Sequence, residues 1–366
     1  MSTDPSSGLD AIRSALLEAD RVVITTHTRP DGDALGTEFA IAQALTALGK
    51  TVLCLNADPA PRNLDWLAEE QPPGMVQTYE AGNLDQAQAV AHADVLLVVD
   101  TNSEKRLGDV AKVFRQAGKP ILLLDHHPDP ESWFSVMHVQ TDAAAAAEIA
   151  YDLIAGVDLD LIDRGVATAL YVGIMTDTGS FRYSATTPKT HAVVADILER
   201  GDLKPEPIHV SLFDGKSRQG LSLLSMALGT IDTHYNGRLA TIFVTQDMIR
   251  SSGAFFDETE GLINYALQLD GVLAAVIGLE LTSGVKLSFR SKGDCPINKW
   301  AGRFGGGGHA NASGAFVQNG QLQRTLKEVV DAAPSHVMAD PSEITETSDE
   351  LSQADLSLLA QFNGSL

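Results

Sequence analysis

The sequence is short of cysteine, of basic residues and of long apolar runs. Its 366 residues include two cysteines, which cannot form a disulfide framework, and the apolar run around Cys54 predicts a buried thiol in a reducing compartment. No apolar run reaches the length of a membrane span, and residues 1–5 lack the basic and apolar character of a secretion signal. These absences predict a cytoplasmic globular protein with no membrane partner.

Acidic residues outnumber basic ones by 48 to 26, which gives a formal net charge of −22. The excess lies in residues 1–216, with 32 acidic and 16 basic residues, and in residues 336–366, with 6 acidic and no basic ones. Residues 217–335 hold 10 of each kind. Because proteins bind long nucleic acids through many cationic contacts to phosphate, this composition argues against tracking along long nucleic acid.

Strand-like runs alternate with helical patterns in the first 200 residues. The predicted strands are 21–27, 51–56, 75–79, 94–100 and 121–127. This alternation predicts an α/β fold whose first domain is a doubly wound, mainly parallel sheet.

Composition also suggests where the domains divide. The first domain is predicted to span 1–201, a segment with linker or hinge character follows at 202–216, and a smaller α/β domain spans 217–335. Residues 336–366 are acidic and rich in serine and threonine, and we expect a flexible tail there.

Side chains of the types that bind metals follow three of the predicted strands and end one helix. They are His27, Asp31, Asp33, Asp100, Asp125, His126, His127 and Asp177. Each of them alone is more often a helix cap or a satisfied core group. Since the carboxyl ends of parallel strands share one edge of a sheet, however, we expect these residues to meet. Imidazole and carboxylate donors without a nearby thiolate favour Mn²⁺, with Mg²⁺ or Co²⁺ as substitutes, and two such ions can act on a phosphoryl group.

These residues resemble the motifs of the DHH phosphoesterases, which include RecJ nucleases, family II inorganic pyrophosphatases and small oligoribonucleases. The matching motifs are His27-x-x-Pro30-Asp31-Gly32-Asp33, Asp100, Asp125-His126-His127 and Asp177. The resemblance implies one Mn²⁺ held by His27, Asp31 and Asp100. It implies a second Mn²⁺ held by Asp33, Asp100, His126 and Asp177, with Asp100 bridging. It further implies that His127 acts on the substrate phosphate and leaving group, and that Asp125 orients a histidine.

The second domain carries a sequence similar to the glycine-rich signature of the DHH-associated C-terminal domain. The signature comprises Gly305, Gly306, Gly307, Gly308 and His309, and Arg290 lies upstream of it. Glycine backbone N–H groups can converge on an anion, so the resemblance implies that these residues bind substrate phosphate. A glycine run alone is just as often a flexible loop. One departure from the family is the run 143–147, which is alanine throughout where the family usually has a small polar Ser/Thr pair.

The resemblance is to NrnA-type members of the family. It implies an Mn²⁺-dependent exoribonuclease and 3′,5′-bisphosphate nucleotidase that cleaves short oligonucleotides and 3′-phosphoadenosine 5′-phosphate in a cleft between the domains. Alternatives are hydrolysis of cyclic or linear dinucleotides (c-di-AMP, pApA, pGpG) and, in a different class, an inactive nucleotide-binding module. Inorganic pyrophosphatase activity is disfavoured by the glycine-rich signature. The segment Gln353–Leu359 resembles a peptide that docks on the replication sliding clamp, but a short amphipathic helix that covers the protein or forms a homodimer contact is favoured.

Overall fold

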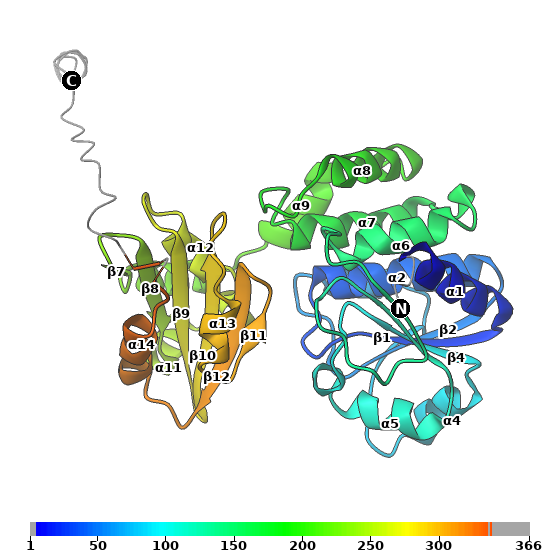
Figure 1. The fold of residues 1–366 in the computed structure, drawn as a ribbon, viewed down its shortest axis with the longest axis horizontal. Helices are drawn as coiled ribbons and strands as arrows, with labels where there is room; N and C mark the ends of the chain where they lie inside the picture. Colours follow the sequence, from blue (N-terminus) through cyan, green and yellow to red (C-terminus); the bar gives the residue numbers. More distant parts are fainter. Residues whose placement is uncertain (1–4, 336, 339–366) are drawn as a thin grey trace, which may run out of the picture. The chain divides into compact units, whose positions relative to one another are not determined.

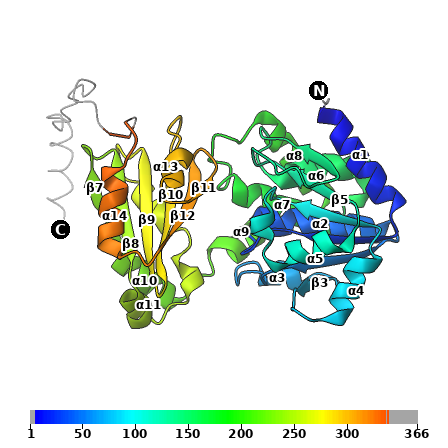
Figure 2. The same ribbon diagram turned by 60° about the horizontal axis from the view of Figure 1, so that its bottom comes forward.

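The structure is a computed structural model that describes residues 5–335 and 337–338. The chain divides into two compact units, Met1–Ser217 and Arg218–Leu366. Figure 1 shows the elements of both units, and Figure 2 shows them turned by 60°. The segment Gln353–Leu359, for which clamp docking was considered, lies outside the described residues.

The first unit is built on a six-stranded sheet in which all strands are parallel, in the order β3-β2-β1-β4-β5-β6. The strands are β1 (Arg21–Thr25), β2 (Thr51–Asn56), β3 (Val76–Thr78), β4 (Val95–Val99), β5 (Ile121–Asp125) and β6 (Val136–Val139). Every residue of β4 and β5 is buried, as expected for strands covered on both faces. The predicted doubly wound α/β fold is confirmed, although β6 was not predicted.

Helices cover both faces of this sheet (Figures 1 and 2). One core cluster joins the sheet to α1, α2, α6 and α7, and another joins its opposite face to α4, η1 and α5. The helices are α1 (Pro5–Glu18), α2 (Gly32–Ala47), α3 (Asp65–Glu69), α4 (Leu84–His92), η1 (Glu104–Leu107), α5 (Asp109–Ala117), α6 (Ala146–Ala155), η2 (Leu159–Leu161), α7 (Arg164–Asp177), α8 (Pro188–Arg200) and α9 (Pro205–Phe213). Helices α2 and α7 pack closely at Gly36. A side chain there would prevent this packing, because its Cβ would overlap the carbonyl oxygen of Ala169.

The direction in which the chain winds through the sheet reverses between β1 and β4. From β1 the chain passes through α2 to β2 on one side, whereas from β4 it passes through α5 to β5 on the other side. Ligands of open α/β sheets bind where the direction of winding reverses in this way, beyond the carboxyl ends of the strands. The ends of β1 and β4, which are direct neighbours, therefore flank the expected site.

The second unit contains a mixed six-stranded sheet in the order β11-β12-β10-β9-β8-β7. Its strands are β7 (Asp232–His234), β8 (Leu239–Val244), β9 (Ala274–Leu281), β10 (Gly284–Ser291), β11 (Gly307–Gly308) and β12 (Ala312–Gln318). One core cluster lies against α13 (Asn298–Gly302) and α14 (Leu322–Asp331). The other lies against α10 (Arg218–Leu228), α11 (Gln246–Ser252) and α12 (Leu262–Leu267), with η3 (Phe256–Thr259) just before α12. This sheet confirms the predicted second, smaller α/β domain.

The segment 202–216 is not a simple linker. It contains helix α9, and the chain divides after Ser217 rather than within this segment. Residues 202–207 were interpreted as having linker character, but Pro205 is the first residue of α9, where proline is favourable. Ile208 and Leu212 of this helix are buried in the core of the first unit. Among the described residues, no helix is long and apolar enough to cross a membrane.

Candidate metal centre

The structure brings the eight predicted polar residues of the first unit together at the carboxyl edge of the sheet. His27 follows β1, Asp100 follows β4, and Asp125 is the last residue of β5. Helix α2 begins directly after Asp31, and α7 ends at Asp177, so two helix termini complete the set. Residues far apart in the sequence thus meet where the winding of the sheet reverses.

A first group of possible ligands consists of His27, Asp31 and Asp100, which each offer an atom within 4.8 Å of the others. The Nε2 atom of His27 lies 3.4 Å from Oδ2 of Asp100 and 3.8 Å from Oδ2 of Asp31. Its Nδ1 lies 2.9 Å from the carbonyl oxygen of Thr28, a distance that assigns the proton to Nδ1. The Nε2 atom is buried and has no hydrogen-bond partner among the described residues.

A second group consists of Asp33, Asp100 and His126, with Asp177 beside them. The Nε2 atom of His126 lies 3.5 Å from Asp100 Oδ1, 3.5 Å from Asp177 Oδ2 and 3.7 Å from Asp33 Oδ2. As in His27, a backbone carbonyl, that of Ala143, lies 3.2 Å from Nδ1 and orients the ring. A hydrogen bond at the far nitrogen is how proteins fix metal-binding histidines.

Asp100 joins the two groups through different oxygen atoms. Its Oδ2 faces His27, and its Oδ1 faces His126 and also lies 3.7 Å from Nδ1 of His127. The residue has a φ of 55°, in the left-handed region that non-glycine residues rarely adopt. Strain of this kind concentrates at functional sites. The geometry is that of a carboxylate able to bridge two ions.

The two aspartates of the β1–α2 loop have distinct local environments. Asp31 caps α2 by accepting hydrogen bonds through Oδ1 from the amides of Asp33 and Ala34, while its Oδ2 faces His27. Asp31 can therefore cap the helix through Oδ1 and still offer Oδ2 to a metal ion. Asp33 is buried and accepts from the amides of Ala146 and Ala147 at the start of α6, at 2.6 and 2.9 Å.

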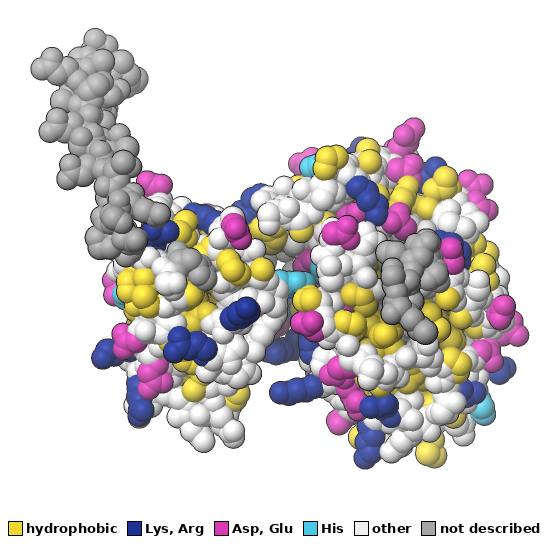
Figure 3. Space-filling view, in the orientation of Figure 1, with side chains coloured by type: hydrophobic (Ala, Val, Ile, Leu, Met, Phe, Trp, Pro, Cys, Tyr) yellow, Lys and Arg dark blue, Asp and Glu magenta, His cyan; other side chains and the backbone are white. Residues whose placement is uncertain are grey.

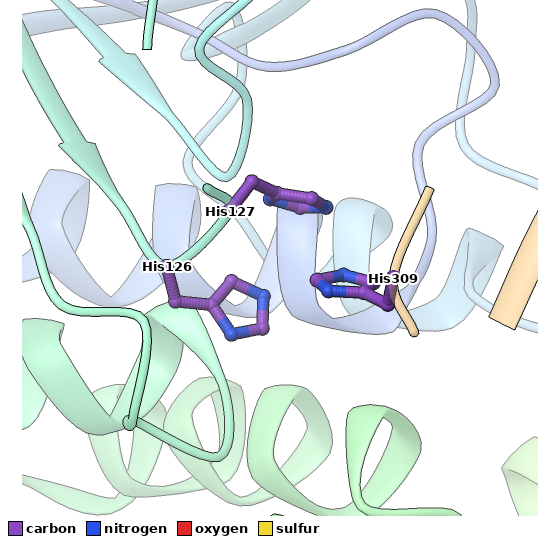
Figure 4. Close-up of side chains that lie close together, drawn as sticks. All are labelled: His126, His127 and His309. Atoms are coloured by element: carbon purple, nitrogen blue, oxygen red, sulfur yellow. The ribbon is translucent and has the colours of Figure 1, made fainter. Parts of the chain in front are cut away.

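His127 is held by the residue that starts its own motif. Its Nδ1 lies 2.8 Å from Oδ1 of buried Asp125, a contact that orients the ring. The rings of His126 and His127 are perpendicular, with centroids 4.8 Å apart, and Figure 4 shows both beyond the end of β5. His309, also labelled there, belongs to the second unit.

Asp33, Asp100 and Asp177 lie close together around His126, and burial together with their mutual repulsion shifts the pKa values of Asp33 and Asp177. Burial, together with the charges of Asp100 and Asp177, raises the pKa of Asp33 well above its usual range. Burial raises the pKa of Asp177 to about 7; there the charge of Asp100 adds to the effect and that of His126 opposes it. Burial opposes protonation of His126, but hydrogen bonding to Asp100 and the nearby carboxylates outweigh it and raise the pKa to about 11. Without a cation, the cluster therefore retains protons near neutral pH.

The donor set fits divalent cations. Burial lowers the pKa of His27, but hydrogen bonding to Asp100 and the charge of Asp31 outweigh it and raise the pKa, so the site favours a proton or a metal ion between Nε2 and these carboxylates. Two donors about 2.1 Å from one ion lie about 3.0–3.4 Å apart, close to the shorter spacings found here. The buried histidine and aspartate clusters therefore form a candidate site for divalent metal ions. Which ions bind, and through which residues, remains a prediction.

Arg106 of η1 is a candidate that the sequence did not single out. Its Nη1 lies 3.4 Å from Nε2 of His127, and its carbonyl accepts a 2.7 Å hydrogen bond from the amide of Thr28. It pairs with no carboxylate among the described residues, whereas Arg115 pairs with Glu104. A short polar turn after β4 was the only available signal, because the contact with His127 depends on the pairing of β4 with β5.

The predicted phosphate-binding residues of the second unit occupy its β11–β12 edge and the end of β10. The glycine run differs from the expectation. The amides of Gly305 and Gly306 donate to the carbonyls of Gly302 and Ala301, so these two N–H groups are not available to an anion. Gly306 is required for space, since a Cβ there would overlap the carbonyl of Gly314. Gly307 and Gly308 pair with β12 as an edge strand, and His309 follows them.

Comparison with known families identifies both units. The sequence model of the family described as "DHH family, N-terminal domain" matches residues 21–174. The sequence model of the DHHA1 domain matches residues 238–334. The bifunctional oligoribonuclease and PAP phosphatase NrnA of Thermus thermophilus is 30% identical over 315 residues, which cover 85% of this chain and 88% of that protein. The NrnA protein of Bacillus subtilis is 25% identical over 321 residues, covering 87% and 96%.

Solved structures share the fold. An exopolyphosphatase-related protein from Bacteroides fragilis superposes with a TM-score of 0.84 at 24% identity, covering 91% of this chain and 98% of its own. RecJ from Thermus thermophilus in complex with Mn²⁺ gives a TM-score of 0.52 at 13% identity, covering 91% of this chain and 55% of its own. These identities are low, so the two likenesses support the two-domain fold and nothing finer.

Proposed function

The chain belongs to the DHH family and carries a DHHA1 domain, and from this premise we propose that it is a two-metal phosphoesterase of the NrnA type. It would hydrolyse short oligonucleotides to mononucleotides and 3′-phosphoadenosine 5′-phosphate to AMP. The observation that carries the proposal is the pair of ligand groups joined by Asp100, together with the similarity to NrnA proteins over most of the chain.

We propose that His27, Asp31 and Asp100 hold one ion and that Asp33, Asp100, His126 and Asp177 hold the other. Mixed imidazole and carboxylate donors favour Mn²⁺, and Mg²⁺ or Co²⁺ could substitute. When bound, such ions polarise a phosphoryl oxygen and lower the pKa of water. The four aspartates would balance the charge of two divalent ions, so metal loading would relieve the repulsion that raises the pKa values of Asp33 and Asp177.

The proton and the phosphate charge would be handled by residues beside this site. With Nδ1 of His127 hydrogen-bonded to Asp125, its Nε2 is the atom that can give a proton to the leaving oxygen. The guanidinium of Arg106 can only donate to that nitrogen, so Arg106 would turn to a phosphate oxygen of the substrate and leave Nε2 to carry the proton. In the second unit, Arg290, His309 and the edge glycines Gly307 and Gly308 would bind another phosphate.

The test is a comparison of substrates with the purified full chain and Mn²⁺. A dinucleotide, a long oligonucleotide, inorganic pyrophosphate and 3′-phosphoadenosine 5′-phosphate are incubated separately, each with and without EDTA. We expect metal-dependent release of mononucleotides from the dinucleotide and of AMP from the bisphosphate. Faster turnover of the long oligonucleotide or of pyrophosphate would contradict the proposal.

A second candidate within the same chemistry is hydrolysis of c-di-AMP, pApA or pGpG. Adding these dinucleotides to the same comparison separates the two candidates.

A further inference from the structure

In the second unit, Lys286 of the sheet lies near two partly exposed phenylalanines, one on the neighbouring strand and one in η3. Phe316 of β12 is directly opposite Lys286 of β10 in the antiparallel register. The Lys286 ammonium lies 5.8 Å from the ring centroid of Phe256 in η3. Phe316 is 46% exposed and Phe256 is 38% exposed. We call these three residues the aromatic ledge.

The ledge occupies the face of the sheet that lies opposite the α13–α14 core. Because side chains alternate along a strand, Val285, Leu287 and Phe289 of β10 are buried in that core, whereas Lys286, Ser288 and Arg290 point to the other face. Over β8 and β9 this other face is buried against α10, α11 and α12. Over β10 and β12 it remains partly open, with Lys286, Ser288 and Arg290 half-buried and Phe316 exposed.

Arg290 stands on the same face as the ledge, further along β10. It is four residues from Lys286, which corresponds to about 13 Å along a strand. It lies opposite Ala312, and the next residue of β12, Ser313, pairs with Gly308. Basic side chains and aromatic rings therefore follow one another from the glycine-rich edge to the ledge. A separation of about 13 Å is about four nucleotides of a stacked strand at 3.4 Å each, and fewer of an extended one.

We propose that the aromatic ledge is a base-binding subsite for short single-stranded oligonucleotides. Phe256 and Phe316 would each stack on a base, and the phosphates between them and the glycine-rich edge would lie along Lys286 and Arg290. Aromatic rings combined with cations that follow the backbone are the usual means of binding single strands without reading their sequence. This inference rests on the proposed function, because it takes Arg290 as a phosphate contact.

The chemistry of the ledge favours a base over a protein partner. Two phenylalanines bury at most about 300–500 Å² between them, whereas a stable protein interface needs about 800 Å² on each side. The charge of this region is also compatible with an anionic oligonucleotide. Residues 217–335 carry no net charge and therefore repel it less than residues 1–216 do, which carry twice as many acidic as basic residues. Figure 3 shows the side-chain types on one face of the second unit, where Lys and Arg are interspersed with hydrophobic residues; it labels no residue of the ledge.

The test measures binding separately from hydrolysis. Trinucleotides with 2-aminopurine at each position in turn are titrated with the full chain in EDTA, so that no metal-dependent cleavage occurs. For at least one position, stacking should quench the fluorescence. Phe316→Ala and Phe256→Ala should reduce that quenching and raise the Kd about 10-fold each, as expected for the loss of one stacked base. Phe316→Tyr should keep both.

The control is Leu221→Ala, which removes another exposed apolar side chain of the same unit, on α10, and should leave binding unchanged. If both phenylalanine variants bind and quench like the unmodified chain, the ledge is not a base site. The same conclusion holds if they change only the oligomeric state seen by light scattering, which would indicate a contact between copies. Quenching in a chain that hydrolyses none of the compared substrates would leave the ledge in place and remove the proposed function instead.

Discussion

The carboxylate of Asp33 accepts a 2.6 Å hydrogen bond from the backbone amide of Ala146, which lies 113 residues further along the chain. A second amide, that of Ala147, and the hydroxyl of Thr37 complete its surroundings. The positive end of the α6 dipole thus supports a buried carboxylate beside the candidate metal site. The N-terminus of α6 therefore orients the carboxylate of Asp33.

Replacing Gly173 with alanine should loosen this support. A Cβ at Gly173 would lie 2.6 Å from the Cβ of Ala147 and 3.0 Å from Oδ1 of Asp33. Such overpacking costs about 1–3 kcal/mol and would displace either α6 or the carboxylate. We expect weaker Mn²⁺ binding by calorimetry and a lower midpoint of unfolding. Gly215→Ala, where no atom lies within 4 Å of the added Cβ, is the control and should change neither.

Asp100→Asn should reduce hydrolysis at least about 100-fold, because an amide offers one weak oxygen donor where two ions need a charged bridge. Asp94→Asn is a matched control at the other end of β4, where the carboxylate binds the amides of Asp20 and Arg21. We expect the control to keep its activity in a metal-dependent dinucleotide assay. Undiminished hydrolysis by Asp100→Asn would disprove the two-metal assignment.

Arg106→Gln should weaken the hold on substrate phosphate. A hydrogen bond to a charged group contributes about 1.5–3 kcal/mol, so kcat/KM should fall about 10- to 100-fold. The loss should be greater for a phosphate monoester than for a diester, because the monoester carries more negative charge at pH 7.

Arg115→Gln serves as the comparison for Arg106→Gln, since Arg115 pairs with Glu104 and lies over the ring of Trp133. Steady-state kinetics on a dinucleotide and on 3′-phosphoadenosine 5′-phosphate would show the difference. Equal losses in both arginine variants would mean that Arg106 only supports the loop.

Glu38 should make the free energy of unfolding depend on pH. Burial raises its pKa to about 8, against the hydrogen bond that it accepts from Asn56. Between the usual pKa of glutamate and pH 8, the folded chain keeps a proton that the unfolded chain has lost, so stability falls by up to about 1.4 kcal/mol per pH unit as pH rises.

Glu38→Gln should remove this pH dependence, because glutamine stays neutral and can still accept from Asn56. We expect the variant to gain stability relative to the unmodified chain between pH 5 and pH 8 in urea titrations of the same metal-free protein. Parallel pH profiles for the two proteins would show that Glu38 is ionised in the folded chain.

Much of the fold and of the candidate site could be predicted from local sequence. Runs such as Val95–Val99 are apolar throughout and alternate with helical patterns, so a parallel sheet was the expected result. The residues after β1, β4 and β5 then had to meet, because parallel strands end at one edge. Strand β6 was missed because its four residues, two of them half-buried, carry no such pattern. Helix α9 was misread because proline at a helix start resembles proline in a linker.

The sequence by itself determined which residue types reach the edge of the sheet, because the chain fixes the order of residues along each strand and the turn that follows it. Only the tertiary structure decided how they are used. It supplied Asp33 with amides from α6, placed Arg106 beside His127, and engaged the amides of Gly305 and Gly306 internally. It also placed Phe316 opposite Lys286 through the β10–β12 register. Each of these depends on segments that are distant in sequence, and their packing is set by the whole fold rather than by any local pattern.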